Sequence, residues 1–483
     1  MTIAQLIARL PASTQVSGDR ERDCTSIAID SRKVEAGALF VALRGEHLDG
    51  HAYIYKAIKN GAVAIVAELG RVTALEDDVT VIHVPDTRRA LSSIAATLYG
   101  DPSQKIDVLG VTGTNGKTTT SRMIASILET SGRPCGVIGT LGWSFRDRTW
   151  PLDNTTPLPP ELQSVLALMR DQGAWACAME VSSHALALDR VEDVRFRVGA
   201  FTNITRDHLD FHQTLEAYAA AKRHLFQLAQ AAVLNADDEH GTRWLGELRG
   251  RMPVLSYSLR GNADLVATRI APDAAGSSFD VDGSAMRVHL PGMFNVSNAL
   301  AAIGVARTLG IDLDTCARGL DRLERVRGRM EYVSGGDIAV VVDYSHTPDS
   351  LENALVALRE STPHALAVVF GCGGDRDRGK RPEMGRIAAA YADRIYVTSD
   401  NPRSEDPAAI IAEIEPGIGA HAHVTEVDRR KAIYRAIDDA KAGDVVLIAG
   451  KGHETYQIIG DQTLPFDDAE VAHEALAARG ART

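Results

Sequence analysis

The stretch VLGVTGTNGKTTT, from Val108 to Thr120, decides the fold. An apolar run over residues 106–111 predicts a buried β-strand, and the small residues after it predict a tight loop. Apolar residues then recur at helical spacing until Gly132, which predicts a helix. We therefore expect a strand, a phosphate-binding loop and a helix in succession.

The loop carries the groups that bind a nucleoside triphosphate. Glycines leave backbone amides open to phosphate oxygens, a lysine can reach the outer phosphates, and a threonine hydroxyl can bind Mg²⁺. The predicted ATP-binding residues are Gly113, Thr114, Asn115, Gly116, Lys117, Thr118 and Thr119. The usual spacing has a glycine where Val111 stands, so the loop is a shortened variant. A Gly- and Thr-rich turn without a ligand is the alternative.

Composition narrows the classes of partner. The chain has 483 residues, 45% hydrophobic and 24% charged, which is ordinary for globular proteins and long enough for about three domains. A net charge of −12 argues against nucleic acid and anionic lipid as partners. Five scattered cysteines indicate reduced thiols, and the first ten residues lack the features of a signal peptide. We expect a cytoplasmic protein with small-molecule substrates.

Alternating strand and helix signals predict an α/β fold with three domains. A small α/β domain is expected over residues 1–86, and a central phosphate-loop domain with a mostly parallel sheet over 87–329. A doubly wound, Rossmann-like domain is expected over 330–483. Asp86 is expected to cap a helix over 87–99, and further helices are expected over 215–228 and 298–309. Ligands should lie at the carboxyl ends of parallel strands.

Two strand ends of the central domain carry candidate metal ligands. Glu180 ends an apolar strand, where phosphate-loop enzymes place an acidic residue that helps to hold Mg²⁺. His208 follows the next strand, although imidazole is an unusual ligand for Mg²⁺. A surface carboxylate and a hydrogen-bonded loop histidine remain the alternatives.

Three polar loops follow apolar strands in the third domain, over residues 371–381, 400–403 and 450–454. The first carries four cations and could be a solvated loop, or it could line a pocket for carboxylates or phosphates. Because parallel strands end at one edge of a sheet, the three loops together suggest a single pocket.

Together these stretches resemble the Mur ligases over nearly the whole chain. The resemblance rests on residues 30–32, 37–42, 112–118, 154–157, 179–184, 203–210, 221–222, 295–299, 328–331 and 343–348, and on the three third-domain loops. The phosphate loop alone would also fit folylpolyglutamate synthetases. The complete set would not.

The resemblance implies an ATP-dependent ligase of peptidoglycan precursor synthesis, with Mg²⁺ as cofactor and a monomeric state. Such an enzyme adds meso-2,6-diaminopimelate to UDP-N-acetylmuramoyl-L-alanyl-D-glutamate through an acyl phosphate. The first domain would bind the UDP end, the central domain ATP, and the third domain the amino acid. The implied contacts to the muramoyl substrate are Ile29, Ser31, Glu46, His47, Leu48, Asn154, Thr155, Thr156, Ser182 and Arg190. Family members often have glutamine at the position of Leu188, so that contact is absent or made otherwise.

The resemblance also implies roles in catalysis. Asn298, Arg329 and Asp343 would assist ATP binding. Lys222 matches a lysine that the family carbamylates, with a plain surface lysine as the alternative. The implied catalytic residues are Lys117, Glu180, His208 and Lys222, and the implied metal ligands are Thr118, Glu180, His208 and Lys222. Positioning and charge neutralisation would supply most of the rate, and closure of the third domain would exclude water.

The incoming amine is predicted from the loop over residues 400–403, which resembles the motif of members that add meso-diaminopimelate. The implied contacts are Arg376, Asp400, Asn401, Pro402, Arg403, Gly450 and Glu454. Arg376 and Arg403 can pair with carboxylates through forked donors, and Glu454 can hold an ammonium group.

Three other functions share some of these sequence features. One is another Mur ligase or a folylpolyglutamate synthetase, although residues 30–32 have no role in the latter. A GTPase switch would need an Asn-Lys-x-Asp-type loop, which the sequence lacks. A silent nucleotide-binding scaffold is the third, and the intact Lys117, Thr118, Glu180 and Lys222 argue against it.

Overall fold

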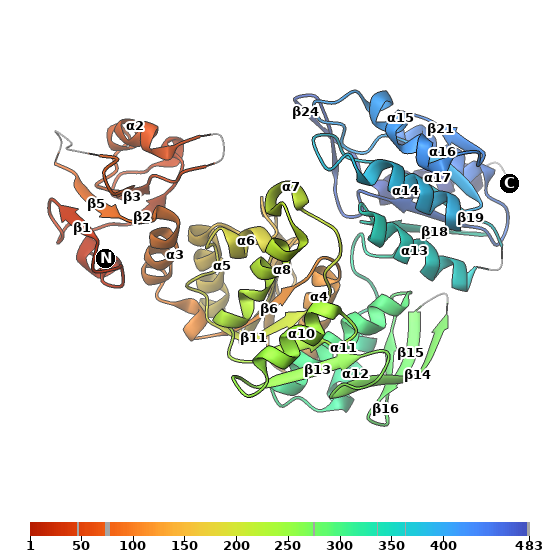
Figure 1. Cartoon of the computed structure of the whole chain (residues 1–483), viewed down its shortest axis with the longest axis horizontal. Helices are drawn as coiled ribbons and strands as arrows, with labels where there is room; N and C mark the ends of the chain where they lie inside the picture. Colours follow the sequence, from red (N-terminus) through yellow and green to blue (C-terminus); the bar gives the residue numbers. More distant parts are fainter. Residues whose placement is uncertain (46–47, 73–77, 274–275, 336, 363, 481–483) are drawn as a thin grey trace. The chain divides into compact units, whose positions relative to one another are not determined.

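The computed structural model describes residues 1–45, 48–72, 78–273, 276–335, 337–362 and 364–480 (Figure 1). The chain forms two compact units. Unit 1 comprises residues 1–112, 133–199 and 221–231, and unit 2 comprises residues 113–132, 200–220 and 232–483. Parallel strands alternate with helices in both units, which confirms the predicted α/β class.

The N-terminal part of unit 1 is a small sheet with helices on both faces (Figure 1). Its elements are α1 (Ile3–Ile7), β1 (Gln15–Ser17), β2 (Ser26–Ala28), β3 (Ala38–Val41), α2 (Ile54–Lys59), β4 (Ala64–Glu68), β5 (Thr80–Val84) and α3 (Thr87–Leu98). The strand order is β1-β5-β4-β3-β2, with only β1 antiparallel among the described strands. Val41 and Val66 pack with α1 and α3, whereas Phe40 and Ile65 pack with α2, because successive side chains of a strand point to opposite faces. Asp86 caps α3, as predicted.

The remainder of unit 1 places Glu180 at the end of a parallel strand. Its elements include β6 (Asp107–Thr112), β7 (Cys135–Gly139), β8 (Gly142–Phe145), β9 (Arg148–Trp150), α5 (Pro159–Asp171), β10 (Ala176–Glu180), α6 (Ser183–Ala187) and α9 (Leu225–Leu228). Strand β10 lies between β6 and β7 and is parallel to both. Glu180 pairs in register with Val111, so it stands at the carboxyl edge where β6 ends.

Strand β11 (Phe196–Phe201) carries the chain from unit 1 into unit 2, and α8 (Leu215–Arg223) carries it back. The central part of unit 2 contains α4 (Lys117–Thr130), α7 (Leu209–His212), β12 (Ala232–Asn235), α10 (Glu239–Leu248), β13 (Val254–Ser258), β14 (Leu265–Asp273), β15 (Gly276–Val281), β16 (Ser284–Val288), α11 (Met293–Thr308) and α12 (Leu313–Asp321). Helix α4 packs against α11 and α12. The phosphate loop therefore begins a helix that is held by two others.

The C-terminal part of unit 2 is a doubly wound sheet (Figure 1, teal to blue). Its elements are β17 (Glu331–Gly335), β18 (Ile338–Asp343), α13 (Pro348–Ser361), β19 (Leu366–Phe370), α14 (Lys380–Tyr391), β20 (Arg394–Val397), α15 (Pro407–Ile418), β21 (His423–Thr425), α16 (Arg429–Asp439), β22 (Val445–Ala449), β23 (Tyr456–Ile459), β24 (Gln462–Pro465) and α17 (Asp468–Gly480). The order is β17-β18-β22-β19-β20-β21, and the strands from β18 to β21 are parallel.

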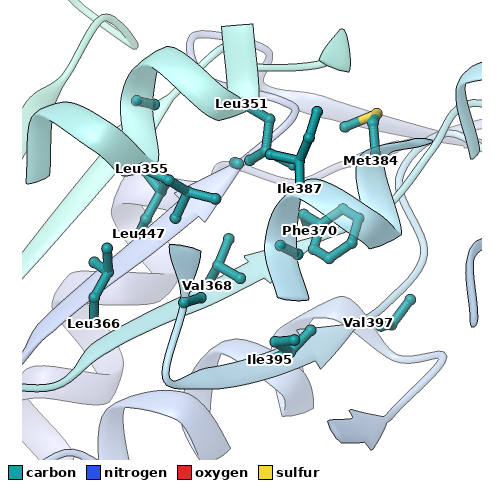
Figure 2. Packing of buried hydrophobic residues seen from close by; sticks show 14 of the residues in the cluster. Leu351, Leu355, Leu366, Val368, Phe370, Met384, Ile387, Ile395, Val397 and Leu447 are labelled. Atoms are coloured by element: carbon teal, nitrogen blue, oxygen red, sulfur yellow. The ribbon is translucent and has the colours of Figure 1, made fainter. Parts of the chain in front are cut away.

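The core of this sheet holds its strand ends in place. Helices α13, α14 and α15 cover one face, and α16 and α17 cover the other. Figure 2 shows Leu351 and Leu355 of α13 and Ile387 of α14 beside Val368 and Phe370 of β19. The loops that leave β19, β20 and β22 therefore each begin after a buried residue, namely Phe370, Val397 and Ala449.

Two predicted helices differ from the structure. The expected helix over 215–228 is two helices, α8 and α9, because His224 interrupts it. The His224 amide bonds to the carbonyl of Ala221, three residues earlier, and its ring contacts Glu192 at 2.8 Å. The helix expected from Asn298 begins at Met293, so Asn298 lies inside it. No helix in the described part of the chain is long and apolar enough to cross a membrane.

Candidate active site

The phosphate loop in unit 2 needs its two glycines. Gly116 has φ +87°, and a Cβ there would lie 2.2 Å from the Oδ1 of Asn298. A Cβ on Gly113 would lie 1.9 Å from the Oγ1 of Thr202. Both positions therefore exclude a side chain, and the backbone stays open at the amino end of α4, where anions bind.

Lys117 and Thr118 begin α4. The Nζ of Lys117 donates to the carbonyls of Gly113 and Thr114, both at 2.8 Å, so the ammonium group lies over the loop. The hydroxyl of Thr118 accepts a 3.0 Å hydrogen bond from the Nη2 of Arg329. The loop thus gathers two cationic side chains at a helix amino end, which suits a polyphosphate.

The other predicted ATP residues lie around Arg329. Its guanidinium lies 4.7 Å from the ring centre of Tyr344, and its Nε is buried with no hydrogen-bond partner among the described residues. Asp343 accepts from the amide of Met330 at 2.7 Å, and burial raises the pKa of its carboxyl group. Asn298 packs on Gly116 and bonds to Asn295. The structure therefore brings Asn298 and Arg329 to the loop, and it places Asp343 where the charge of Arg329 acts on it.

A second polar loop supports Asn115. The amide of Asn115 donates to the Oδ1 of Asn203 at 3.0 Å, and its carbonyl accepts from the hydroxyl of Thr202 at 2.6 Å. The hydroxyl of Thr114 lies 3.1 Å from that of Tyr218. Thr119 is buried in the first turn of α4. These contacts hold the phosphate loop against the loop over residues 202–205 and against Tyr218.

His208 is half-exposed and begins α7 with φ +53°. Its Nε2 lies 3.4 Å from the Oδ2 of Asp207. Burial acts to raise the pKa of Asp207, but the positive charges of His208, His346 and Lys117 outweigh it and lower the pKa. Asp207 is therefore an anion on which the charge of Lys117 acts, whereas only its neighbour His208 is a predicted site residue.

Glu180 in unit 1 is buried, and its carboxylate has protein partners. Oε1 accepts from the amide of Thr140 at 2.8 Å, and Oε2 lies 3.1 Å from the hydroxyl of Thr140. A Cβ on Gly139 would lie 2.2 Å from Oε1. Thr140 follows the end of β7, and the sequence reasoning missed it because nothing in its local pattern marks it.

The predicted muramoyl-binding residues of unit 1 gather around Thr156. Its hydroxyl donates to the carbonyl of Glu180 at 2.8 Å and accepts from the amide of Ser182 at 3.1 Å. Arg190 donates to the carbonyl of Thr156 and to the Oδ1 of Asn154. Thr155 contacts the hydroxyl of Thr140 at 3.2 Å. These side chains meet at the carboxyl end of β10.

A cavity in unit 1 is lined by both Arg190 and Leu188. Its walls include Leu43, Leu91 and Leu158 and the arginines Arg44 and Arg88. Burial, and then the charge of Arg88, lower the pKa of Arg190. Leu188 therefore contributes apolar surface at the place where a glutamine would offer hydrogen bonds.

Other predicted residues of unit 1 are spread more widely. Ser31 is buried and its carbonyl accepts from the Nδ2 of Asn60 at 2.8 Å, Ile29 is half-buried, and Leu48 is exposed. Glu46 and His47 lie outside the described residues.

Lys222 is 1% exposed, so it is not a surface lysine. No three His, Cys, Asp or Glu side chains in the described ranges are grouped so as to hold a metal by themselves.

The three third-domain loops meet at the carboxyl edge of the sheet in unit 2. The Nδ2 of Asn401 donates to Glu454 at 2.8 Å, and the Nζ of Lys451 donates to Asn401 at 3.0 Å and to Glu454 at 3.2 Å. Gly450 has φ +121°, and a Cβ there would lie 2.5 Å from the Oδ2 of Asp400. The amide of Gly374 donates to the carbonyl of Asn401 at 2.9 Å, so the loop over residues 371–381 joins the other two. That the three loops form one ligand pocket stays a prediction.

Two arginines flank this cluster. Arg403, which follows Pro402, has φ +54° and donates to the carbonyl of Gly374 at 2.8 Å. The exposed Arg376 donates to the carbonyl of Asp375 at 3.0 Å. Burial, and then repulsion from Asp400, raise the pKa of Glu454, against the opposing effect of Lys451. The cluster therefore places carboxylates and guanidinium groups close together, as an amino acid with charged ends requires.

The basic run over residues 371–381 is neither wholly solvated nor wholly part of a pocket. Arg381 lies in the first turn of α14 with no exposed surface, and its guanidinium bonds to Glu405 and Glu413. Arg378 pairs with Glu413, and Lys380 donates to the carbonyl of His346 at 2.8 Å. These three cations pair with groups of the protein itself. Because Arg381 is also fully buried, the solvated-loop alternative is wrong for that residue.

The fold and the loop define an α/β protein in which a loop of the phosphate-binding type joins a parallel strand to a helix. Models of Mur ligase domains match the chain: the family's catalytic domain at residues 23–99, its middle domain at 111–306 and its glutamate ligase domain at 328–452. A UDP-N-acetylmuramoyl-L-alanyl-D-glutamate--2,6-diaminopimelate ligase from Syntrophomonas wolfei is 47% identical over 491 residues, which cover 99% of each chain. The chain belongs to the Mur ligase family.

Solved structures agree with this family. A structure described as UDP-N-acetylmuramoyl-L-alanyl-D-glutamate--2,6-diaminopimelate ligase has a TM-score of 0.70 at 34% identity and covers 99% of both chains. The MurF ligase of Thermotoga maritima in complex with ADP has a TM-score of 0.66 at 21% identity, over 95% of this chain and 98% of that one. The second likeness shows the fold alone. The resemblance seen in the sequence is confirmed.

Proposed function

We propose that this chain joins meso-2,6-diaminopimelate to UDP-N-acetylmuramoyl-L-alanyl-D-glutamate and converts ATP to ADP and phosphate. The observation that carries this proposal is the cluster of Asn401, Lys451 and Glu454 beside Arg403, because it offers groups of both charges to an amino acid with charged ends. The full-length relative from Syntrophomonas wolfei, whose name describes this reaction, supports it.

The chemistry follows from the poor reactivity of a carboxylate. The γ-phosphoryl group of ATP passes to a glutamate carboxylate of the muramoyl peptide, which gives an acyl phosphate and ADP. The amine then attacks the acyl carbon, phosphate leaves, and the amine loses a proton. Lys117, Arg329 and the amides at the start of α4 hold and neutralise the phosphates, so positioning and electrostatics supply the rate without a protein nucleophile.

The three parts of the chain divide these tasks. We assign UDP-end binding to residues 1–86, ATP binding to 87–329 and amino-acid binding to 330–483. Thr155, Thr156, Ser182 and Arg190 would hold the muramoyl peptide. The separate family models over residues 23–99, 111–306 and 328–452 support this division. No disulfide joins any of the five cysteines, all of which lie in the described residues, and this supports a reducing compartment such as the cytoplasm. We also propose a monomer.

Mg²⁺ is the proposed cofactor. The hydroxyl of Thr118 and the carboxylate of Glu180 are oxygen donors that suit Mg²⁺, and His208 is a less usual ligand. An ammonium group cannot bind a cation, so Lys222 fits only as its carbamate, and its burial favours loss of the positive charge. When bound, Mg²⁺ would neutralise phosphate charge. Carbon-13 NMR of protein incubated with labelled bicarbonate should detect a carbamate that Lys222→Ala abolishes.

An amine screen tests the function. Purified protein is given ATP, the muramoyl dipeptide and one of diaminopimelate, lysine or ornithine, and phosphate release is followed. We expect turnover with diaminopimelate and a rate lower by about 10³-fold with lysine, because lysine leaves an arginine unpaired. No phosphate release with any amine contradicts the proposed ligase activity. Equal rates contradict only the amine specificity.

A further inference from the structure

Arg429 and Asp468 form a fully buried ion pair behind the amino-acid loops. Neither side chain has any exposed surface. The Nε and Nη2 of Arg429 donate to the two carboxylate oxygens of Asp468 at 2.8 and 2.7 Å, in a bidentate arrangement. Arg429 begins α16 and Asp468 begins α17, so the pair joins two helices on the same face of the sheet.

The same guanidinium also reaches the ends of two strands. Its Nη2 donates to the carbonyl of Ala449 at 3.0 Å, and its Nη1 lies 3.5 Å from the carbonyl of Ser399. Ala449 is the last residue of β22, and Gly450 follows it. Ser399 comes directly before Asp400. Arg429 therefore contacts the chain immediately before two of the three loops that form the proposed amino-acid site.

The two loops touch each other above Arg429. A Cβ on Gly450 would lie 2.5 Å from the Oδ2 of Asp400 and 3.9 Å from the Nη2 of Arg429. Asp400 and Lys451 are both buried, and Asp400 and Glu454 act on Arg429 electrostatically. Asp400 and Glu454 each bring a carboxyl group to these two loops, and carboxylate oxygens can accept hydrogen bonds from a ligand ammonium group.

We propose that Arg429 is a positioning residue for the incoming amino acid, which keeps the Asp400 and Gly450 loops in register and Asp400 and Glu454 directed at its ammonium group. Arg429 acts through these loops and does not touch the substrate itself. The inference rests on the proposed function, because it concerns the site where diaminopimelate would bind. The diaminopimelate contacts that the sequence resemblance implies all lie in the three third-domain loops. Arg429 lies outside these loops, at the start of α16.

The test compares Michaelis constants for the three substrates in the full-length protein. Arg429→Met removes both carbonyl contacts and the charge, so we expect the KM for diaminopimelate to rise about tenfold or more, because buried polar partners are left unpaired. The KM values for ATP and the muramoyl dipeptide should change less than about twofold, within the ordinary range for an untouched site. Arg429→Lys should restore part of the loss, because one ammonium group replaces some of the guanidinium contacts.

A double variant separates positioning from stability. Arg429→Met with Asp468→Leu replaces the ion pair by apolar side chains, which is often neutral or stabilising, so it should unfold near the wild-type temperature. It should still show the raised KM for diaminopimelate. If Arg429→Met alone fails to fold, the KM for diaminopimelate is measured on the double variant.

Arg394 provides the matched control. Arg394 is the first residue of β20, and it pairs at 2.9 Å with Asp444, which directly precedes β22. This ion pair therefore lies where the two strands begin, whereas Arg429 contacts the chain where they end. Arg394→Met should lower the unfolding temperature and leave the KM for diaminopimelate unchanged. The inference is overturned if the double variant has the wild-type KM for diaminopimelate, or if Arg429→Met raises all three KM values equally. Lack of wild-type ligation would instead refute the proposed function.

Discussion

The side-chain amide of Asn115 donates a 2.8 Å hydrogen bond to the carboxylate of Asp349, 234 positions later in the chain. Asp349 lies in the first turn of α13, and its Oδ2 also lies 3.4 Å from the hydroxyl of Thr205. The third-domain helix thus contacts the phosphate loop and the loop that supports it. Sequence reasoning missed Asp349, although its place just after a strand and a helix cap was a usable signal.

Loss of this carboxylate should weaken ATP binding. Asp349→Ala leaves the Asn115 amide without its partner, and we expect the KM for ATP to rise about three- to tenfold, the range for one hydrogen bond. Asp349→Asn keeps an acceptor oxygen, so its KM for ATP should lie between the values of the wild type and of Asp349→Ala. The control is Glu352→Gln on the same helix, where Glu352 accepts from the hydroxyl of Tyr391. An equal effect of Asp349→Ala and Glu352→Gln on the KM for ATP would contradict a role for Asp349 at the loop.

Two glycines with similar backbone angles should differ in their response to alanine. Gly116 has φ +87° and a Cβ there would meet Asn298, whereas Gly132 has φ +78° and open space around it. Gly132→Ala should cost about 1–2 kcal/mol of stability and leave nucleotide affinity unchanged. Gly116→Ala should weaken ATP binding about tenfold or more, because the loop must move. Nucleotide titration and thermal unfolding of both variants check this, and equal affinities would refute it.

Arg403 should decide the choice of amine. Its guanidinium is held by the carbonyl of Gly374, which places a forked donor beside Asn401. Arg403→Ala should raise the KM for diaminopimelate about 100-fold or more, because a charged partner of the distal carboxylate is lost. The KM for ATP should stay near the wild-type value. Steady-state kinetics with each substrate varied in turn measure both, and equal rises in the two constants would count against this role.

Glu405 should stabilise the fold in a pH-dependent way. Hydrogen bonds from Arg381, then from the amide of Asp375, lower the pKa of Glu405 from 4.5 to about 2. Because the folded-state pKa is depressed, this stabilisation is complete above about pH 4.5 and is lost as the pH falls toward 2. Glu405→Gln should reduce the free energy of unfolding by about 1–3 kcal/mol at pH 7.

Urea unfolding at pH 7, 5 and 3 tests this dependence. The difference between wild type and Glu405→Gln should shrink between pH 5 and pH 3, because Glu405 of the unfolded chain becomes protonated near its ordinary pKa of 4.5, whereas the folded protein keeps the carboxylate ionised until the pH approaches 2. The exposed Glu470 supplies the control, and Glu470→Gln should give the same small difference at each pH. A Glu405→Gln difference that is constant with pH would show that Arg381 does not depress the pKa.

Local sequence patterns predicted the parts of the molecule that depend on near neighbours. The strand before Gly113, the helix from Lys117 and the cap at Asp86 follow from periodicity and from backbone groups that need partners within a few residues. The meeting of the loops after β19, β20 and β22 was also predictable, because parallel strands place their carboxyl ends at one edge.

The sequence by itself therefore determined the α/β class, the nucleotide loop and the family. Tertiary structure alone decided that Arg381 is buried against Glu405 and Glu413, that His224 breaks a helix, and that Asp349 reaches Asn115. The physical reason is that a side chain's burial and charge partners depend on residues distant in the chain, and no local pattern encodes which distant carboxylate will meet a given cation or amide.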